Sequence, residues 1–312
     1  MTATILKHGK FDAVPPLATG AARVPAVAAV PVAPAAPAAS DDAPPARRRL
    51  PLVEKYGDEI AGFFRDAIPV FFGLAMFVAI WAMLSAHSTL PGPLKTLQSA
   101  IAIFSDPFYR KGPNDQGIGW NILMSLGRVG IGFGMAALIG IPLGFMIGRF
   151  HFLARMTSPI ISLLRPVSPL AWLPIGLLVF KAANPAAIWV IFISSIWPMI
   201  VNTAVGVREV PQDYLNVAKV LNLSEWKVFT RILFPAALPF VLTGIRLSIG
   251  VAWLVIVAAE MLTGGVGIGF WVWDEWNNLN VEHIIIAIFV VGIVGLLLEQ
   301  MLMLIARRFE YR

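Results

Sequence analysis

The sequence contains no cysteine and few charged residues. Without cysteine, neither a disulfide framework nor a thiolate metal site is possible in this chain of 312 residues. Only 13% of the residues are charged, whereas soluble proteins carry about 25%. The four histidines show no metal-ligand spacing, so we expect no metal site; they are His8, His87, His151 and His283.

Motifs for catalysis and nucleotide binding are also missing. No G-x-x-x-x-G-K-[ST] phosphate loop occurs, because Gly9-Lys10 is followed by Phe11. No Ser/His/Asp constellation is evident either, which argues against an integral-membrane enzyme. We therefore expect a non-catalytic chain that binds no cofactor of its own.

Apolar residues dominate what is present. They make up 58% of the chain, and its mean hydropathy is +0.76. This much apolar surface must face lipid, so we predict an all-α membrane protein with about six transmembrane helices. The net charge of +6 fits basic cytoplasmic loops better than a nucleic-acid partner. The expected spans are residues 67–85, 119–148, 159–180, 186–206, 240–262 and 283–306.

The chain divides into three parts by composition. Residues 1–49 are rich in Ala, Pro and Val and predict a disordered cytoplasmic tail, without the pattern of a signal peptide. We expect a deletion of residues 2–45 to leave transport intact. Residues 50–117 predict an amphipathic lead-in, the first span and an outer loop with a short helix near Leu94 to Phe104. Residues 118–308 form the main transmembrane domain.

Glycine and proline mark two of the spans. In the second span, small residues four positions apart favour close approach of helix backbones, first at Gly130 and Gly134 and then at Gly140, Gly144 and Gly148. The third span is interrupted by four prolines, which is tolerated where a helix lines a cavity. They are Pro159, Pro166, Pro169 and Pro174.

The basic residues predict the orientation in the membrane. Arginines and lysines concentrate on one side of the predicted spans, and the positive-inside rule places that side in the cytoplasm. With an even number of spans, both termini are then cytoplasmic in a multi-pass protein of the inner membrane. The basic residues on this side include Arg47, Arg48, Arg49, Arg149, Arg155, Arg208, Lys219, Lys227, Arg231, Arg307 and Arg308.

A polar stretch between two apolar runs, DYLNVAKVLNLSEWKVFTRILFPAALP, organises the chain within the loop 207–239. It predicts two short helices, the first starting at Asp213. Asn222 and Ser224 break the first helix, and Ser224 caps the second, which opens with an acidic residue. Pro235 and Pro239 are expected to end the pattern. A segment of this kind is suited to docking onto a partner outside the lipid.

This stretch resembles the cytoplasmic motif of ABC-importer permeases, Glu-Ala-Ala, three residues, Gly, nine residues, Ile, one residue, Leu-Pro. Ala218, Ile232 and Pro235 match the motif, whereas Asn216, Val217, Asn222 and Phe234 depart from it. The resemblance covers about residues 117–308 and implies the membrane domain of a type I importer. It implies an ATPase-docking set of Asp213, Asn216, Ala218, Asn222, Leu223, Ser224, Glu225, Trp226, Ile232 and Pro235.

The resemblance also implies partners. They are two ABC ATPase subunits that bind ATP and Mg, a second permease copy in a homodimer, and a periplasmic or lipid-anchored substrate-binding protein. The alternative of an ATP-independent secondary transporter predicts inverted repeats or ion-pair relays, and it leaves the docking segment unexplained.

The loop after the fifth span, Ala258 to Asn280, is similar to that of the nitrate and bicarbonate permease branch, which is related to the alkanesulfonate and taurine permeases. Its glycines predict a flexible re-entrant turn, and its tryptophans suit the membrane interface. Two roles remain possible for these residues: anchoring the chain at the membrane interface and forming part of the outer gate. The residues are Gly265, Gly267, Gly269, Trp271, Trp273 and Trp276.

A translocation path is expected to use polar residues within the spans. Arg128 either draws an anion inward or ties two helices together. We expect the Arg128→Gln variant to fold and to support ATP turnover, but to lose most nitrate uptake. Arg246 and Glu260 complete the charged candidates, and Glu299 is expected to meet a helix partner. Ser194 and Ser195 either donate to a passing oxyanion or bond back to their own helix.

The leading hypothesis is therefore the membrane subunit of an ATP-driven importer for a small inorganic oxyanion, nitrate or nitrite first. The same machine carrying bicarbonate, cyanate, or an alkanesulfonate or taurine is the alternative.

Overall fold

The structure, a computed structural model, describes residues 52–310, and these residues contain helices but no strand. The chain divides into two units, Met1–Asp66 and Ala67–Arg312. The predicted tail, residues 1–49, lies outside the described residues. The expected lead-in and first span belong to one helix, α1 (Leu52–Ala86), of which Ala67–Ala86 is apolar enough to cross a membrane.

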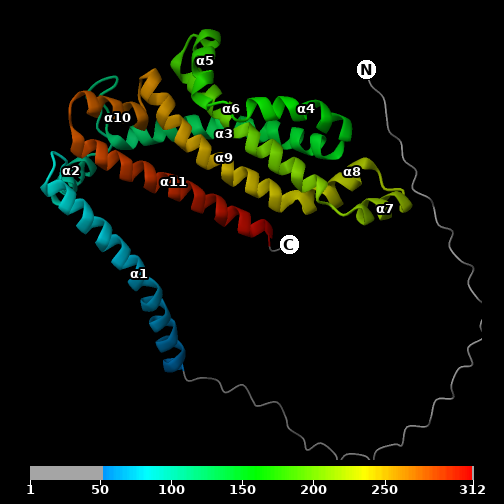
Figure 1. Ribbon diagram of the computed structural model, residues 1–312, viewed down its shortest axis with the longest axis horizontal. Coiled ribbons are helices and arrows are strands. Elements are labelled where there is room, and N and C mark those ends of the chain that lie inside the picture. The colour runs from blue at the N-terminus through cyan, green and yellow to red at the C-terminus, as the bar shows by residue number, and fades with distance from the viewer. Residues whose placement is uncertain (1–51, 311–312) are drawn as a thin grey trace, which may run out of the picture. The chain divides into compact units, whose positions relative to one another are not determined.

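Helices of very different length follow in the second unit (Figure 1). Five stretches of the described residues are long and apolar enough to span a membrane, or six if one bent helix pair counts as a span. The elements are α2 (Pro93–Ser105), α3 (Ile118–Arg149), α4 (His151–Leu164), η1 (Pro169–Trp172), α5 (Leu173–Phe180), α6 (Ala183–Arg208), α7 (Gln212–Val220), α8 (Glu225–Val228), the π-helical η2 (Phe229–Leu233), α9 (Phe234–Thr263), α10 (Ile268–Asn277) and α11 (Val281–Glu310).

Helices α3, α6 and α9 pack side by side and form the core of the second unit. Close approach of α3 to α6 depends on small residues, and three of the five expected glycines take part, Gly140, Gly144 and Gly148. Gly130 and Gly134 have open space beside them. The α6-facing glycines follow one helical stripe, with a spacing of four residues or multiples of it, and are Gly132, Gly140, Gly144 and Gly148.

The third span differs from the expectation. It begins at His151 rather than near residue 159, and it breaks between Leu164 and Pro169, where the two halves bend by 96°. Pro166 and Pro169 fall at this break, because proline lacks the N–H that would continue the helix. Pro159 is tolerated inside α4.

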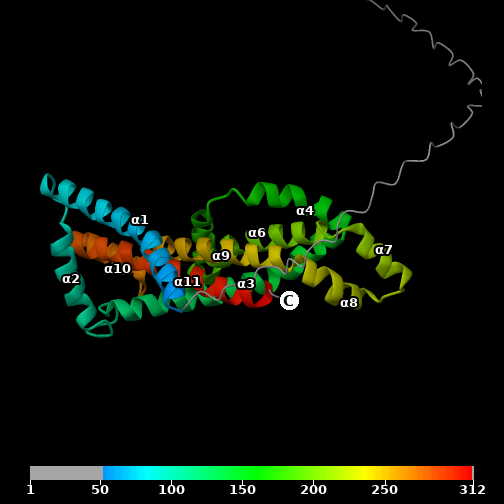
Figure 2. The same cartoon turned by 90° about the horizontal axis from the view of Figure 1, so that it is seen from below.

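The expectation that Pro235 and Pro239 end the docking pattern was wrong. The second short helix, α8, leads through the π turn directly into α9, so residues 225–263 form a single span-length stretch. Pro235 lies in the first turn of α9, where its missing N–H matters little, and Pro239 lies within the helix. Figure 2 shows α7 and α8 at one end of the unit and α10 with α2 at the other.

Candidate docking segment and buried polar network

The turn between α7 and α8 has the geometry of a helix C-cap. The Leu223 N–H donates to the Ala218 carbonyl oxygen (3.0 Å), and the Asn222 N–H donates to that of Lys219 (3.0 Å). These two bonds form a Schellman motif, which places its central residue in the left-handed region. Asn222 has a φ of 49°. Asparagine tolerates this conformation better than most residues, which explains why it replaces the glycine of the docking motif.

The docking residues divide into an inner and an outer set. Ala218, Leu223 and Ile232 pack in an apolar cluster with the ends of α3, α6 and α9, including Phe145 and Val207. This cluster holds α7 and α8 against the membrane helices. The outer set is exposed and consists of Asp213, Asn216, Asn222, Ser224, Glu225, Trp226 and Pro235.

The start of α8 presents a charged and an aromatic side chain to the outside. Ser224 occupies the N-cap position as expected, although its side chain makes no capping hydrogen bond. Glu225 pairs loosely with Arg149 at the end of α3, at 3.4 Å. Trp226 is 72% exposed and stacks on Phe229. Tryptophan is among the residues that are enriched at protein interfaces.

The far end of the unit contains a buried polar network centred on Glu260 of α9. Its carboxylate accepts hydrogen bonds from Arg128 Nη1, from Ser125 Oγ (2.8 Å) and from the Gly269 N–H (3.0 Å). Arg128 Nε in turn donates to Asn184 Oδ1 of α6 (2.6 Å). The network therefore joins α3, α6, α9 and the beginning of α10.

The same network holds the loop before α10. Asn121 Oδ1 accepts from the Gly267 N–H (2.9 Å), and Ser125 Oγ accepts from the Ile268 N–H (2.9 Å). A Cβ atom at Gly269 would overlap the Val257 carbonyl oxygen. Gly267 and Gly269 are thus packed and hydrogen-bonded, which corrects the expectation of a flexible turn.

The positive φ values in this loop fall on Gly264 (76°) and Gly265 (91°). They reverse the chain between α9 and α10, so the conformational freedom of glycine is needed there.

The tryptophans of α10 have different environments. Trp271 is only 8% exposed and stacks on His283 of α11, with ring centroids 6.0 Å apart. Its burial argues against the interfacial-anchor alternative at this position, because the helix turns this face towards α11. Trp273 and Trp276 are 43% and 57% exposed, which leaves them available to the interface.

The remaining path candidates are dispersed. Arg246 pairs with Glu299 of α11, the helix partner expected for Glu299. Ser194 Oγ donates back to the Ile191 carbonyl oxygen (2.8 Å), the commoner of the two alternatives. Ser195 is buried, and its carbonyl oxygen accepts from Ser248 Oγ (2.7 Å). The five path candidates therefore do not converge on one site.

Reasoning from the sequence missed Asn121, Ser125 and Asn184. The first two were detectable, because residues 121, 125 and 128 follow the i, i+4, i+7 spacing that puts polar groups on one face of an apolar helix. Asn184 lies at the start of α6 and carries no such signal.

A bundle with five or six stretches long and apolar enough to cross a membrane is the fold of an integral membrane protein. Residues 140–312 match the protein family described as the binding-protein-dependent transport system inner membrane component. The chain belongs to this family.

Its relatives include nitrate and bicarbonate permeases. The chain is 46% identical over 270 residues to the nitrate import permease NrtB of Leptolyngbya laminosa, covering 86% of this chain and 97% of the relative. To NrtB of Synechocystis sp. it is 46% identical over 258 residues (82% and 91%). To the bicarbonate transport permease CmpB of Synechocystis sp. it is 45% identical over 240 residues (75% and 86%).

Solved structures share the fold. One chain of the MetNI methionine ABC transporter superimposes with a TM-score of 0.52 at 16% identity, over 61% of this chain and 94% of its own length. An amino acid ABC transporter gives the same score and identity, over 69% and 97%. The all-α membrane fold expected from the sequence is thereby confirmed.

Proposed function

We propose that this chain is the membrane-spanning permease subunit of an ATP-driven importer for a small inorganic oxyanion, with nitrate or nitrite as the first cargo. The observation that carries the proposal is the 46% identity to a nitrate import permease over 97% of that protein. The match extends over 86% of this chain, so it is not confined to one segment.

Bicarbonate is the second candidate cargo. It is supported by the 45% identity to a bicarbonate permease, which is nearly as high as the identity to the nitrate permeases. Cyanate and alkanesulfonates or taurine are further cargoes to include in the test. With each of these cargoes the proposed transporter is the same, and only the transported anion differs.

The exposed face of α7 and α8 is proposed to bind ABC ATPase subunits, which would hold ATP and Mg. Support comes from the outer docking residues, above all Glu225 and Trp226, on a segment packed firmly against α3, α6 and α9. A segment held in this way transmits a rigid-body movement to the spans. A second permease copy and a substrate-binding protein complete the proposed assembly.

The docking end is proposed to face the cytoplasm, with both termini on that side of the inner membrane. Support comes from the basic residues at the ends of α3 and α6 and along the docking segment, including Arg149 and Arg208.

The test is uptake of labelled nitrate, bicarbonate and a sulfonate by cells that contain the complete transporter. Nitrate uptake that requires the ATPase subunit supports the proposal. Uptake of bicarbonate or the sulfonate, without uptake of nitrate, would show that this anion is the cargo instead of nitrate. Uptake by cells that contain the permease but lack the ATPase would favour an ATP-independent transporter and contradict the proposal.

A further inference from the structure

Helix α4 has a polar face that the site described above does not use. Its polar side chains follow the 4-3-4-3 spacing of one helical stripe, and we call this set the α4 stripe: His151, Arg155, Ser158, Ser162 and Arg165. The other face is apolar and outward-facing, with Phe152 77%, Met156 51%, Ile160 52% and Leu163 71% exposed. A helix with two such faces separates lipid from a polar space.

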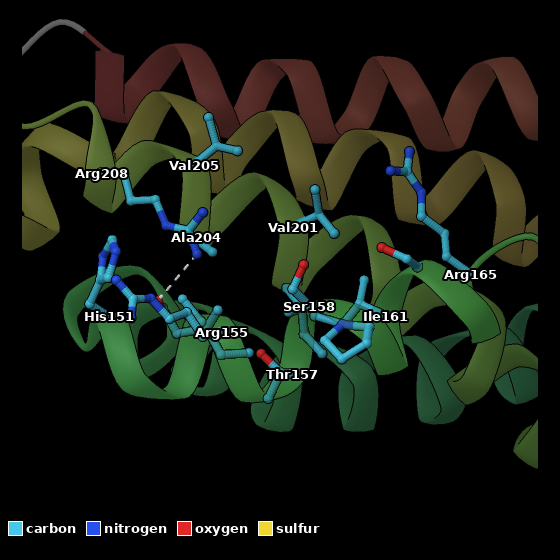
Figure 3. A pocket seen from close by; sticks show the side chains of 15 residues that line it. His151, Arg155, Thr157, Ser158, Ile161, Arg165, Val201, Ala204, Val205 and Arg208 are labelled. Atoms are coloured by element: carbon cyan, nitrogen blue, oxygen red, sulfur yellow. Dashed lines mark hydrogen bonds between the residues drawn. The ribbon is translucent and has the colours of Figure 1, made fainter. Parts of the chain in front are cut away.

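The α4 stripe lines a cavity of about 700 Å³ between α4 and α6, which we call the basic cavity. Figure 3 shows His151, Arg155 and Arg208 gathered at one end and Arg165 at the other, with Ser158 between them. Arg208 reaches the Ile147 carbonyl oxygen at 3.5 Å. Among residues 52–310, no acidic side chain lines the basic cavity.

The basic cavity therefore differs from the buried network. Arg128 is neutralised by Glu260, whereas Arg155 and Arg208 at one end of the basic cavity and Arg165 at the other have no carboxylate among the lining residues. Burying such charges in lipid costs on the order of 3 kcal/mol each on insertion scales, so the cavity is expected to hold water or an anion.

Arg165 connects this cavity to a second one. It also lines a cavity of about 170 Å³ together with Ser194, Trp197 and Pro198 of α6. The 14 positions from His151 to Arg165 correspond to ~21 Å of helix, which is most of a bilayer's hydrocarbon thickness. The two cavities thus extend from the interior of the bundle to the docking end.

We propose that the α4 stripe is an oxyanion exit route, in which Arg165 receives the anion from the Ser194 cavity and Arg155 and Arg208 draw it towards the docking end. The inference rests on the proposed function of anion import. Arginines along a water-filled groove raise the local concentration of anions without enclosing them, which permits release.

Because this chain contains no cysteine, a single introduced thiol in the complete transporter is its only thiol and tests the route. Ser158→Cys places a thiol on the α4 stripe, and Leu163→Cys places one on the apolar face as the matched control. We expect an anionic methanethiosulfonate reagent to modify Ser158→Cys about tenfold faster than Leu163→Cys, because the groove is wet and positive. Equal rates for the two thiols would overturn the route.

Charge removal then tests the role of the arginines. In the Ser158→Cys background, Arg165→Gln and Arg155→Gln are expected to lower the ratio of anionic to cationic reagent rates about tenfold, whereas Arg165→Lys and the distant Lys111→Gln leave it nearly unchanged. An unchanged ratio in the Gln variants would overturn the proposal. This readout does not depend on which anion is transported, so a failed nitrate assay and a failed route are distinguishable.

Protection experiments separate the two sources of an oxyanion. Slower modification of Ser158→Cys in the presence of nitrate supports the route. Protection by phosphatidylglycerol but not by nitrate, bicarbonate or a sulfonate would identify a lipid headgroup site and overturn the route. Finally, Arg165→Gln should lower anion uptake about tenfold with ATPase assembly intact, and Arg165→Lys should recover most of it.

Discussion

Glu260 and Arg128 form an ion pair between α9 and α3 in which the side chains are only 1% and 10% exposed. Ser125 and the Gly269 N–H satisfy the remaining capacity of the carboxylate. Glu260 therefore neutralises the positive charge of Arg128, so this charge is not available to attract an anion. This arrangement supports the alternative that Arg128 ties helices together, and it changes the expected result of its replacement.

Arg128→Gln is expected to destabilise the subunit rather than give a folded chain with a transport defect. Removing one partner of a buried ion pair leaves the other charge uncompensated, which costs about 3–5 kcal/mol. The Arg128→Gln, Glu260→Gln double variant should recover much of this loss. Thermal unfolding of the purified complex measures both.

The matched control is Arg149→Gln, whose partner Glu225 is 82% exposed. Because an exposed pair is worth about 1 kcal/mol or less, this variant should melt close to the wild type. If Arg128→Gln also melted close to the wild type, the stabilising role of the pair would be refuted.

Asn222 tests the conformation of the docking turn. Its φ of 49° is accessible to glycine without strain, so Asn222→Gly should retain assembly with the ATPase and full stability. Asn222→Val should lose about 1–2 kcal/mol, because a β-branched residue is strained in the left-handed region. Thermal unfolding and ATPase co-purification are the measurements.

Val220→Thr in the last turn of α7 serves as a control, since Val220 is 86% exposed and its backbone is helical. It should behave like the wild type in both measurements. If the Asn222→Val variant were as stable as the wild type and still co-purified with the ATPase, the left-handed turn would be dispensable.

Glu225→Ala combined with Trp226→Ala should abolish co-purification of the ATPase or uncouple ATP hydrolysis from uptake. The reason is that these side chains carry the exposed charge and the exposed aromatic surface at the start of α8. Trp276→Ala, at the other end of the unit and 57% exposed, is the control and should leave assembly intact. Normal assembly together with normal uptake in the double variant would exclude docking at this position.

Much of the fold followed from hydropathy. The expected spans 119–148 and 186–206 lie within α3 and α6, because long apolar runs have no alternative to lipid or to neighbouring helices. Proline was the main source of error. Pro235 lies in the first turn of a helix and leaves the span continuous, whereas Pro166 lies at the break where the third span bends.

The network around Glu260 could not be predicted as a whole. Glu260 and Arg128 lie 132 positions apart, and only the folded chain brings them together. Its pairing with Arg128 depends on the packing of α3 against α9, which the sequence does not reveal. Trp271 was misplaced for the same reason, because the sequence does not reveal which face of a short helix α11 covers.

The glycines of α3 allow a test of helix packing with a matched pair of substitutions. A Cβ atom at Gly144 would lie 2.6 Å from Thr203 Cβ and 2.9 Å from the Ile200 carbonyl oxygen of α6. At Gly134, nothing lies within 4 Å of the same atom. Both residues lie within one helix, so an alanine at each position has a similar effect on the unfolded chain.

Gly144→Ala should therefore cost about 1–3 kcal/mol, because α6 must move away from α3 to accommodate the methyl group. Gly134→Ala should be neutral or stabilise by up to about 1 kcal/mol, since alanine favours the helix over glycine. Thermal unfolding of the purified complex compares the two, with an expected difference of several degrees. If both variants melted together, the contact between α3 and α6 would not depend on the stripe that includes Gly144.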